Sequence, residues 1–361
     1  MAFVFAITCS AQSRPEPSPS PKAAGEDAPG AQPAKPATAS PVHPEFKRWV
    51  DIEAVSLSTR YRLVKNSAGV TTNNQQQWQI AARGRFKFDK RGRYSVYAGL
   101  FTGNAINSGW NNTGLGTGDL QTKLYVKQLF LQAKPGGGVD MQFGSIAVNN
   151  GENTEITGYD NDVYITGERV TLRRPKDVYF DEVSATFAFL GDNNRPSVFR
   201  RFRHLNKSNY HQFLVRKQVT KRVGFSADYT FESGRDTLRQ AVRVKVPETE
   251  LVDVVLFENY QRVSPDVGYG FNLSGEKAAT KKLTINGGFA RIDRPMLNAD
   301  RFPPGKRLYL GGSFKLSREF SVSSIIIQGV GRLPTLQTPR TRFELILTYN
   351  FVQTLRRLKL L

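Results

Sequence analysis

The sequence is poor in the residues that build metal and redox sites. Cys9 is the only cysteine, and the three histidines are His43, His204 and His211. A single thiol can form neither an intramolecular disulfide nor a thiolate metal cluster, and so few histidines disfavour a histidine-rich metal site. The glycine-containing stretch GTGDLQTK at 116–123 lacks the spacing of a phosphate-binding loop. We therefore expect no metal and no cofactor.

Long apolar runs and tryptophan are also lacking. No stretch of about 18 consecutive apolar residues occurs, which excludes an ordinary helical membrane span. The chain has 3 Trp against 13 Tyr and 24 Phe, together with 31 Gly. This balance is typical of a β-protein with glycine turns and aromatic bands. A membrane β-barrel stays open, because alternating strands produce no long apolar run.

Acidic residues are scarce relative to basic ones. The 361 residues include 31 Asp and Glu against 51 Lys and Arg, which gives a formal net charge of +20 at pH 7. A basic surplus of this size points to anionic partners, which are nucleic acid, anionic lipid or small anionic solutes. Residues 1–44 carry three basic and three acidic residues, so the whole surplus belongs to residues 45–361.

The first 44 residues divide into two segments. Residues 1–11, MAFVFAITCSA, have the apolar stretch and small final residues of a secretory signal whose basic start is missing. A lipoprotein signal ending at Cys9 matches less well, and an ordinary apolar N-terminus is the alternative. Residues 12–44 are rich in Pro, Ala and Ser, which predicts a disordered tether rather than a domain.

Beyond this tether, apolar and polar residues alternate again and again. The clearest stretches are 78–88, 222–232, 237–246 and 306–316. In the first of them, Trp78, Phe86 and Phe88 share one face while Arg83 and Arg85 share the other. A period of two is that of a strand with one apolar and one polar face. The alternation often runs for about ten residues, which is the length of a tilted strand that crosses a bilayer.

The connections between these stretches take turns in length along the chain. The short ones are 89–92, 135–138, 175–177, 220–221, 247–249, 276–281 and 317–319. The others, mostly longer, are 66–74, 103–119, 149–161, 191–209, 233–236, 263–266, 293–305 and 333–339. Tight turns on one side and long loops on the other are typical of an outer-membrane barrel.

The pattern predicts an all-β fold, a transmembrane antiparallel up-and-down β-barrel over residues 45–351. Seven short and eight outer connections separate 16 strands, and both termini then fall on the side of the short turns. The count becomes 14 if residues 162–174 belong to a loop instead of a strand.

The last predicted strand, RFELILTYNF at 342–351, carries the most specific signal. Its apolar face consists of Phe343, Leu345, Leu347, Tyr349 and Phe351. In this strand the chain resembles bacterial outer-membrane porins, whose closing strand alternates up to a terminal aromatic residue that the barrel-assembly machinery recognises. The resemblance covers the architecture of residues 45–361. The chain departs from it in the short basic tail 352–361, VQTLRRLKLL, since the family normally ends at the aromatic residue.

The resemblance and the strand count together predict a channel. A barrel of about 16 strands is too wide for its own side chains to fill and encloses water. By alternation, ten basic residues would face this channel and favour anions there. They are Arg83, Arg85, Lys87, Arg216, Arg239, Arg243, Lys245, Arg307, Lys315 and Arg342. Alternatively, these residues flank the membrane belt or meet lipopolysaccharide phosphates, because alternation determines facing and not depth.

The third outer connection, 149–161, is the candidate constriction loop. General porins fold their third loop into the lumen, with its acids facing a basic wall. The resemblance implies the same role for Glu152, Glu155 and Asp160, opposite Arg83, Arg85 and Lys87. The alternative is a solvated polar loop outside the lumen.

The resemblance also implies a setting and partners. We expect a bacterial outer-membrane protein of Gram-negative type that contacts outer-membrane lipids, lipopolysaccharide and the assembly machinery. Its solutes would be small anionic or neutral molecules, a homotrimer is compatible with its size, and no nucleic acid is expected despite the basic charge.

Three rival functions stay open at the level of sequence. A non-conducting barrel could anchor the envelope, with the Pro-rich segment reaching towards peptidoglycan. A barrel hydrolase would need a serine activated by histidine, for which Ser208 lies between His204 and His211. A secreted soluble all-β binding protein would explain the alternation but not the regular succession of tight and longer connections. We expect no enzymatic activity.

Overall fold

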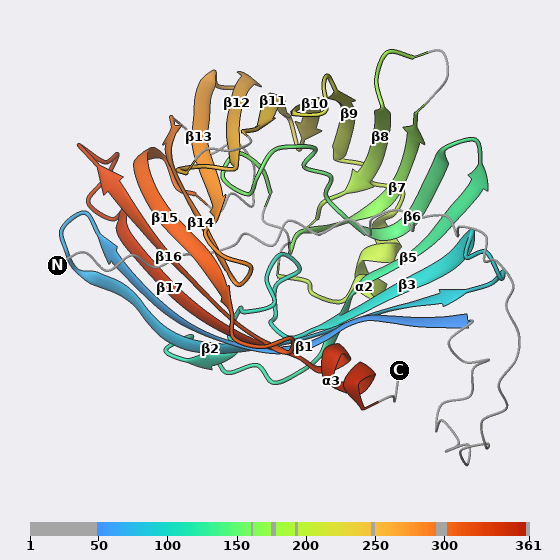
Figure 1. Cartoon of the computed structure of the whole chain (residues 1–361), viewed down its shortest axis with the longest axis horizontal. Coiled ribbons are helices and arrows are strands. Elements are labelled where there is room, and N and C mark those ends of the chain that lie inside the picture. Colours follow the sequence, from blue (N-terminus) through green and yellow to red (C-terminus); the bar gives the residue numbers. More distant parts are fainter. Residues whose placement is uncertain are drawn as a thin grey trace, which may run out of the picture.

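The computed structural model describes residues 49–159, 162–174, 178–191, 194–246, 250–293 and 302–358. The expected signal segment 1–11 and tether 12–44 lie outside these residues, as do Cys9 and His43. Within the described part, strands dominate and follow one another in chain order around a single wall (Figure 1).

The strands are all antiparallel to their neighbours. Their bounds are β1 (Val50–Asn66), β2 (Thr71–Lys87), β3 (Tyr94–Phe101), β4 (Gly114–Leu115), β5 (Tyr125–Gly136), β6 (Val139–Ala147), β7 (Tyr164–Arg173), β8 (Glu182–Phe189), β9 (Tyr210–Gln218), β10 (Val223–Glu232), β11 (Arg235–Lys245), β12 (Val254–Ser264), β13 (Gly268–Ala278), β14 (Leu283–Ile292), β15 (Gly305–Lys315), β16 (Phe320–Val330) and β17 (Pro339–Asn350).

The wall closes on itself through the first and last strands. β1 pairs with β17 from Ser56 opposite Asn350 to Asn66 opposite Pro339, and β1 pairs with β2 on its other side. The two-residue β4 only adds to the end of β2, so the closed barrel has 16 strands. The predicted all-β barrel of 16 strands is confirmed. Residues 162–174, the least certain prediction, supply β7, which pairs with β6 and β8.

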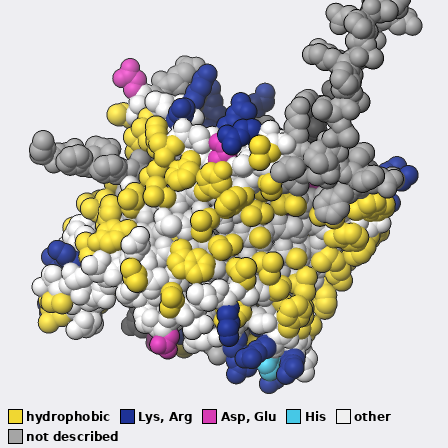
Figure 2. Space-filling model, turned by 90° about the horizontal axis from the view of Figure 1, so that it is seen from below, with side chains coloured by type: hydrophobic (Ala, Val, Ile, Leu, Met, Phe, Trp, Pro, Cys, Tyr) yellow, Lys and Arg dark blue, Asp and Glu magenta, His cyan; other side chains and the backbone are white. Residues whose placement is uncertain are grey.

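The outer face of the wall is apolar. Leu57 and Tyr349 are cross-strand partners that both point outward. Glu168 lies between its cross-strand partners Phe143 and Phe187, and all three point outward as well. The side chains of Leu57, Phe143 and Phe187 are exposed. Figure 2 shows apolar side chains spread broadly over one side of the wall, with Lys and Arg gathered near its two edges. This is the two-faced pattern that the alternating sequence predicts.

The inner face is polar and closely packed. Inward-facing side chains such as Ser226, Asp228, Arg239, Glu258 and Asn272 have almost no exposed surface. Two loops lie within the ring of strands, namely the second outer loop (residues 102–124) and the described parts of the third outer loop (residues 148–159 and 162–163) (Figure 1). At the end of the barrel that carries the outer loops, the interior is therefore filled by a network of polar groups and is not an empty tube.

The strands that close the barrel share one buried carboxylate. Glu344 on β17 is completely buried and accepts hydrogen bonds from Arg62 and, at 2.8 Å, from the Nη2 of Arg342. Arg60 lies 3.7 Å from the same oxygen. Arg62 and Glu344 are direct cross-strand partners. Three positive charges on β1 and β17 thus converge on one negative charge at the closure.

Short helical segments with bounds within the described residues accompany the strands. They are α2 (Val198–Arg201), the 3₁₀ turn η1 (Phe202–His204) and α3 (Phe351–Arg357). In the described residues, no helix has the length and apolar character needed to cross a membrane. The tail after the last strand is therefore partly helical, since α3 begins directly after β17.

Replacing Glu344 with Gln should destabilise the closed barrel. The change removes the negative charge on which Arg60, Arg62 and Arg342 converge, and loss of one member of a buried charge network typically costs about 3 kcal/mol or more. We expect the E344Q barrel to unfold at lower temperature and lower urea concentration than the unmodified protein, as measured by the heat-modifiable gel shift. Glu276→Gln, on an exposed side chain of β13, is the matched control. Equal stability of the two variants would contradict this role of Glu344.

Candidate functional site in the barrel interior

The basic residues of β2 face the interior and are already paired. Arg85 forms an ion pair with Asp51 on β1, and its Nη1 donates to the Tyr97 hydroxyl at 3.0 Å. The Nζ of Lys87 lies 2.9 Å from the same Asp51 carboxylate. One acid thus serves two cations, and both keep part of their surface exposed.

Arg83 lies two residues before Arg85, on the same face of β2, and has a different environment. Its Nη2 donates to the Tyr164 hydroxyl at 3.2 Å, and its guanidinium lies 5.1 Å from the centre of the Phe101 ring. Phe101 and Tyr164 are both buried. Arg83 therefore joins β2, β3 and β7 across the inner face.

A second basic group lies on β9 and β11. Arg216 forms an ion pair with Glu152 of the third outer loop, and the Nη1 of Arg243 lies 4.0 Å from the other oxygen of the same carboxylate. Arg243 keeps 42% of its side chain exposed, and Lys245, at the end of β11, is exposed as well. The loop carboxylate comes from the connection between β6 and β7, and the two guanidinium groups come from β9 and β11, so this contact holds the loop against the inner face of the wall.

Arg239, also on β11, is enclosed. It is completely buried, its Nη2 lies 2.9 Å from Asp228, and its guanidinium lies 6.0 Å from the ring of Tyr159. The side chain is thus enclosed between the wall and the third outer loop. It faces inward as the sequence predicts, but it has no surface to offer a solute.

The three remaining basic candidates differ from one another. Arg307 on β15 is buried and donates to the backbone oxygens of Pro303, Pro304 and Pro339 at 2.8–3.0 Å, which holds two loop ends together. Arg342 shares Glu344 and keeps 18% of its side chain exposed. Lys315 is exposed at the end of β15, next to the tight turn to β16.

The third outer loop is fastened to the far wall by one buried acid. Glu258 on β12 is completely buried and accepts hydrogen bonds from the Thr154 amide, from the Thr154 hydroxyl at 2.9 Å and from the Thr157 hydroxyl at 2.8 Å. Asn272 on β13 donates to it as well. Because the loop leaves from β6 and returns to β7, these contacts draw it across the interior.

Two further contacts support the same placement. The Glu152 amide donates to the Ser226 hydroxyl at 2.8 Å. The Tyr159 hydroxyl donates to Glu232 on β10. Burial, and then the charge of Glu232, raise the pKa of Tyr159 well above its ordinary value. The phenol therefore stays protonated and keeps donating across the physiological range.

The acidic candidates of this loop have separate positions. Glu152 meets Arg216 and Arg243 on β9 and β11, and not the basic residues of β2. Glu155 is buried, with 5% of its surface exposed. Asp160 lies outside the described residues. Glu152 thus lies against basic wall residues.

Several interior residues are not among the candidate site residues that the sequence predicts. Arg60 stacks on the ring of Trp110 at 4.5 Å and donates to Gln77, whose amide in turn donates to the Trp110 oxygen at 2.8 Å. The Nζ of Lys127 donates to the backbone oxygens of Ala105 and Ser108 at 2.7 and 2.8 Å. These side chains hold the second outer loop inside the barrel. The alternation of β1 signals that Arg60 faces inward, but no sequence pattern indicates the partner loop.

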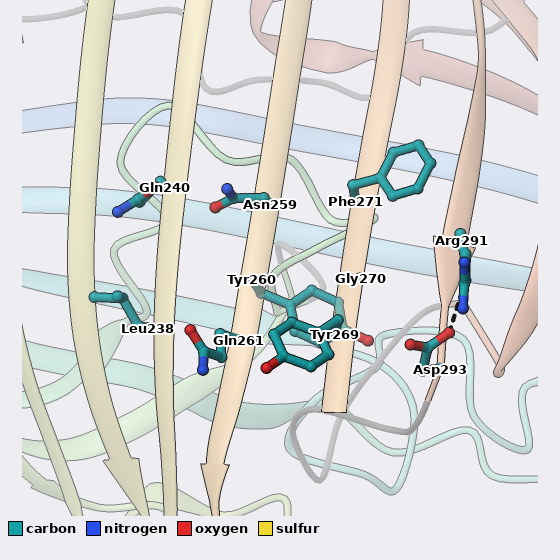
Figure 3. A pocket seen from close by; sticks show the side chains of 10 residues that line it. All are labelled: Leu238, Gln240, Asn259, Tyr260, Gln261, Tyr269, Gly270, Phe271, Arg291 and Asp293. Atoms are coloured by element: carbon teal, nitrogen blue, oxygen red, sulfur yellow. Dashed lines mark hydrogen bonds and ion pairs between the residues drawn. The ribbon is translucent and has the colours of Figure 1, made fainter. Parts of the chain in front are cut away.

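A hollow lies on the outer side of the wall. A groove of about 500 Å³ crosses β11 to β14, and Leu238, Gln240, Asn259, Gln261 and Tyr269 are among its lining residues (Figure 3). Arg291 and Asp293 pair there at 2.8 Å. Gln240 and Asn259 are cross-strand partners on the outward face. The groove therefore belongs to the outer surface and cannot meet a solute in the lumen.

Ser208 and His211 do approach each other. The Ser208 hydroxyl lies 2.8 Å from Nε2 of His211, and it is also placed to donate to the Ala188 oxygen at 3.2 Å. His211 lies among the rings of Phe187 and Phe231 on the outward face. Within the described residues, no three His, Cys, Asp or Glu side chains are close enough together to hold a metal ion.

Replacing Glu258 with Ala should release the third outer loop. Four donors lose their acceptor, so the loop no longer has a fixed position across the interior. We expect faster cleavage by a glutamate-specific protease at Glu152 and Glu155 in the folded, detergent-solubilised protein. Glu276→Ala, which touches neither loop, is the control. An unchanged cleavage rate in E258A would show that other contacts hold the loop.

The fold is similar to that of solved bacterial porins. OprB of Pseudomonas putida, in a low-pH structure, aligns with a TM-score of 0.53 at 10% identity, over 85% of this chain and 94% of OprB. A mutant Rh. blastica porin gives 0.51 at 12% identity, over 84% of this chain and 100% of that porin. Salmonella typhi OmpF in complex with daunomycin gives 0.52 at 10% identity, over 84% and 97%.

Comparison of the amino-acid sequence with known families and proteins gives no match. No protein-family model matches the chain, and no curated protein is similar enough to it to be matched. The likeness therefore concerns the fold, and on that level the predicted porin-like architecture is confirmed.

Proposed function

We propose that this chain is an outer-membrane porin, a water-filled channel for passive diffusion of small hydrophilic solutes with a preference for anions. Its fold is that of porin-type channels. The observation that carries the proposal is a loop carboxylate held against basic wall residues inside a closed 16-strand barrel. Such a site would be a constriction lined by fixed charges, which selects among solutes by their charge and does not react with them.

The proposed anion preference follows from the unequal exposure of charge along the interior. Arg85, Arg216 and Arg342 keep 18–26% of their side chains exposed and Arg243 keeps 42%. The acids next to them are shared, since Asp51 serves two cations and Glu152 two more. The exposed balance is thus positive, which raises the local concentration of anions. Arg239 and Arg307 are left out of this lining because they are buried.

The proposed location is the bacterial outer membrane. The apolar outer face suits contact with lipid acyl chains. Tyr349, near the end of the closing strand, packs on Phe351, the first residue of α3, and we assign both to recognition by the barrel-assembly machinery. The exposed basic residues at the edges of the wall suit lipopolysaccharide phosphates. A homotrimer is compatible with this architecture, and no contact with nucleic acid is proposed.

A barrel hydrolase is the second candidate, favoured by the contact between Ser208 and His211. Activation of the serine requires its proton to move to the histidine, whereas here the hydroxyl is also placed to donate to a backbone oxygen. Replacing His211 with Ala separates the functions. The channel function predicts unchanged solute flux in H211A, and loss of an esterase activity towards a short-chain phospholipid would instead establish the hydrolase.

Liposomes containing the folded protein should swell in neutral sugars up to a size limit. A water-filled lumen admits small sugars at rates that fall steeply with solute size, while protein-free liposomes and heat-unfolded protein give no swelling. A correctly folded barrel that permits no swelling with the smallest sugar would favour the non-conducting anchor.

Replacing Glu152 with Gln should increase anion selectivity. A unit charge about 8 Å from an ion in water is worth about 0.5 kcal/mol, with opposite sign for anions and cations, so the anion-to-cation permeability ratio should rise about two- to five-fold. The reversal potential in a KCl gradient measures this ratio. Glu168→Gln is the matched control, because Glu168 faces outward between Phe143 and Phe187. Equal reversal potentials in the two variants would remove Glu152 from the ion path.

A further inference from the structure

The segment after the last strand is a helix with specific contacts to the barrel. Asn350 begins α3, because its side chain accepts a hydrogen bond from the Val352 amide at 3.0 Å. The Tyr349 hydroxyl lies 2.6 Å from the Thr354 hydroxyl. Val352 is buried, with 2% of its surface exposed. These contacts fix the helix to the end of the wall.

The helix lies where β1 extends past the end of β17 and pairs with β2 only. The pairing of β1 with β17 ends at Ser56 opposite Asn350, whereas β1 itself begins at Val50. α3 packs against β1, and it is seen beside β1 in Figure 1. This end of the wall is the side of the tight turns, because the turn from β15 to β16 lies next to it. The Nη1 of Arg357 lies 3.2 Å from Glu319 of that turn.

One stripe of α3 is apolar and uncovered. Phe351, Leu355 and Leu358 recur at the spacing i, i+4 and i+7, which places them on one side of a helix. Phe351 is 39% exposed and Leu358 is 58% exposed, while Val352 on another side is the residue that packs on the barrel. The stripe is therefore exposed at Phe351 and Leu358 and half-buried at Leu355, on a different side of the helix from Val352.

This stripe continues the outer wall. Phe351 packs edge-on to Tyr349, with ring centres 4.8 Å apart, and Tyr349 packs on Phe320 at 5.8 Å. Tyr349 is the cross-strand partner of Leu57, which is exposed on the outward face. The apolar surface that we assign to lipid thus extends without a break from the last strands onto the helix.

The other side of the helix is basic. Arg356 and Arg357 are exposed, Arg357 to 65% even while paired with Glu319. An apolar stripe flanked by arginines is the pattern of a helix that lies in the plane of a membrane surface, where the arginines reach lipid phosphates.

We propose that α3 is an interfacial helix that binds anionic glycerophospholipid at the periplasmic surface of the membrane. Phe351, Leu355 and Leu358 enter the boundary between headgroups and acyl chains, and Arg356 and Arg357 contact the headgroup phosphates. This inference rests on the membrane location proposed above and goes beyond it, because it assigns a lipid class to one named element and one leaflet.

Native mass spectrometry of the full-length folded protein in detergent tests the proposal, with phosphatidylglycerol and phosphatidylcholine as probes. We expect tighter binding of phosphatidylglycerol, and in R356Q/R357Q a loss of roughly fivefold per arginine. The matched control is R91Q/R318Q, which removes the same charge from two exposed arginines in tight turns at the same edge. Control binding within twofold of the unmodified protein supports the proposal. Equal losses in both variants, or no loss in either, overturn it.

A second variant tests the apolar stripe. L358S should weaken the binding of both lipids by a similar factor, because it removes an apolar contact and no charge. Unchanged binding would exclude the stripe from the lipid contact. The heat-modifiable gel shift verifies that each variant is folded. The channel is assessed separately, since R356Q/R357Q should conduct like the unmodified protein. Lipid binding without any conductance would reject the channel and keep the interfacial helix.

Discussion

Closure of the barrel between β1 and β17 is the constraint on which the rest depends. Only a closed wall leaves no unpaired strand edge, and only a closed wall separates an outer apolar face from an inner polar one. At this closure the Glu344 carboxylate forms ion pairs with Arg60, Arg62 and Arg342. Opposite charges of the first and last strands thus meet only in the correct register, in which Arg62 lies directly opposite Glu344.

The interior shows how a wide barrel handles many charges. Buried groups near the two inward loops pair with one another or with a loop, as with Arg239 beside Asp228 or Glu258 beneath the third outer loop. A buried charge without a partner would be costly, so each loop contact also stabilises the wall. Other charges stay partly exposed, Arg243 most clearly. The first group holds the loops inside the barrel, and the second group keeps charge exposed on the inner face.

Strands and facing follow from the sequence because both depend on a local period of two. Phe86 and Arg85 fall on opposite faces by alternation alone, and tight turns locate the strand ends. Depth and partners do not follow, because they depend on loops and on strands far away in the chain. Arg239 and Arg307 look like lining residues by alternation, yet one is enclosed by the third outer loop and the other by loop backbone. Glu344 meets Arg62 across 282 positions, which no local pattern encodes.

The most direct test of the account is the single-channel conductance of the unmodified protein in a planar bilayer, with a KCl gradient to give the reversal potential. A wide lumen with an exposed positive balance predicts stepwise open currents and a reversal potential of anion-selective sign. A correctly folded barrel that stays silent would contradict the channel. Open currents that favour cations would contradict the assignment of Arg85, Arg216 and Arg243 to its lining.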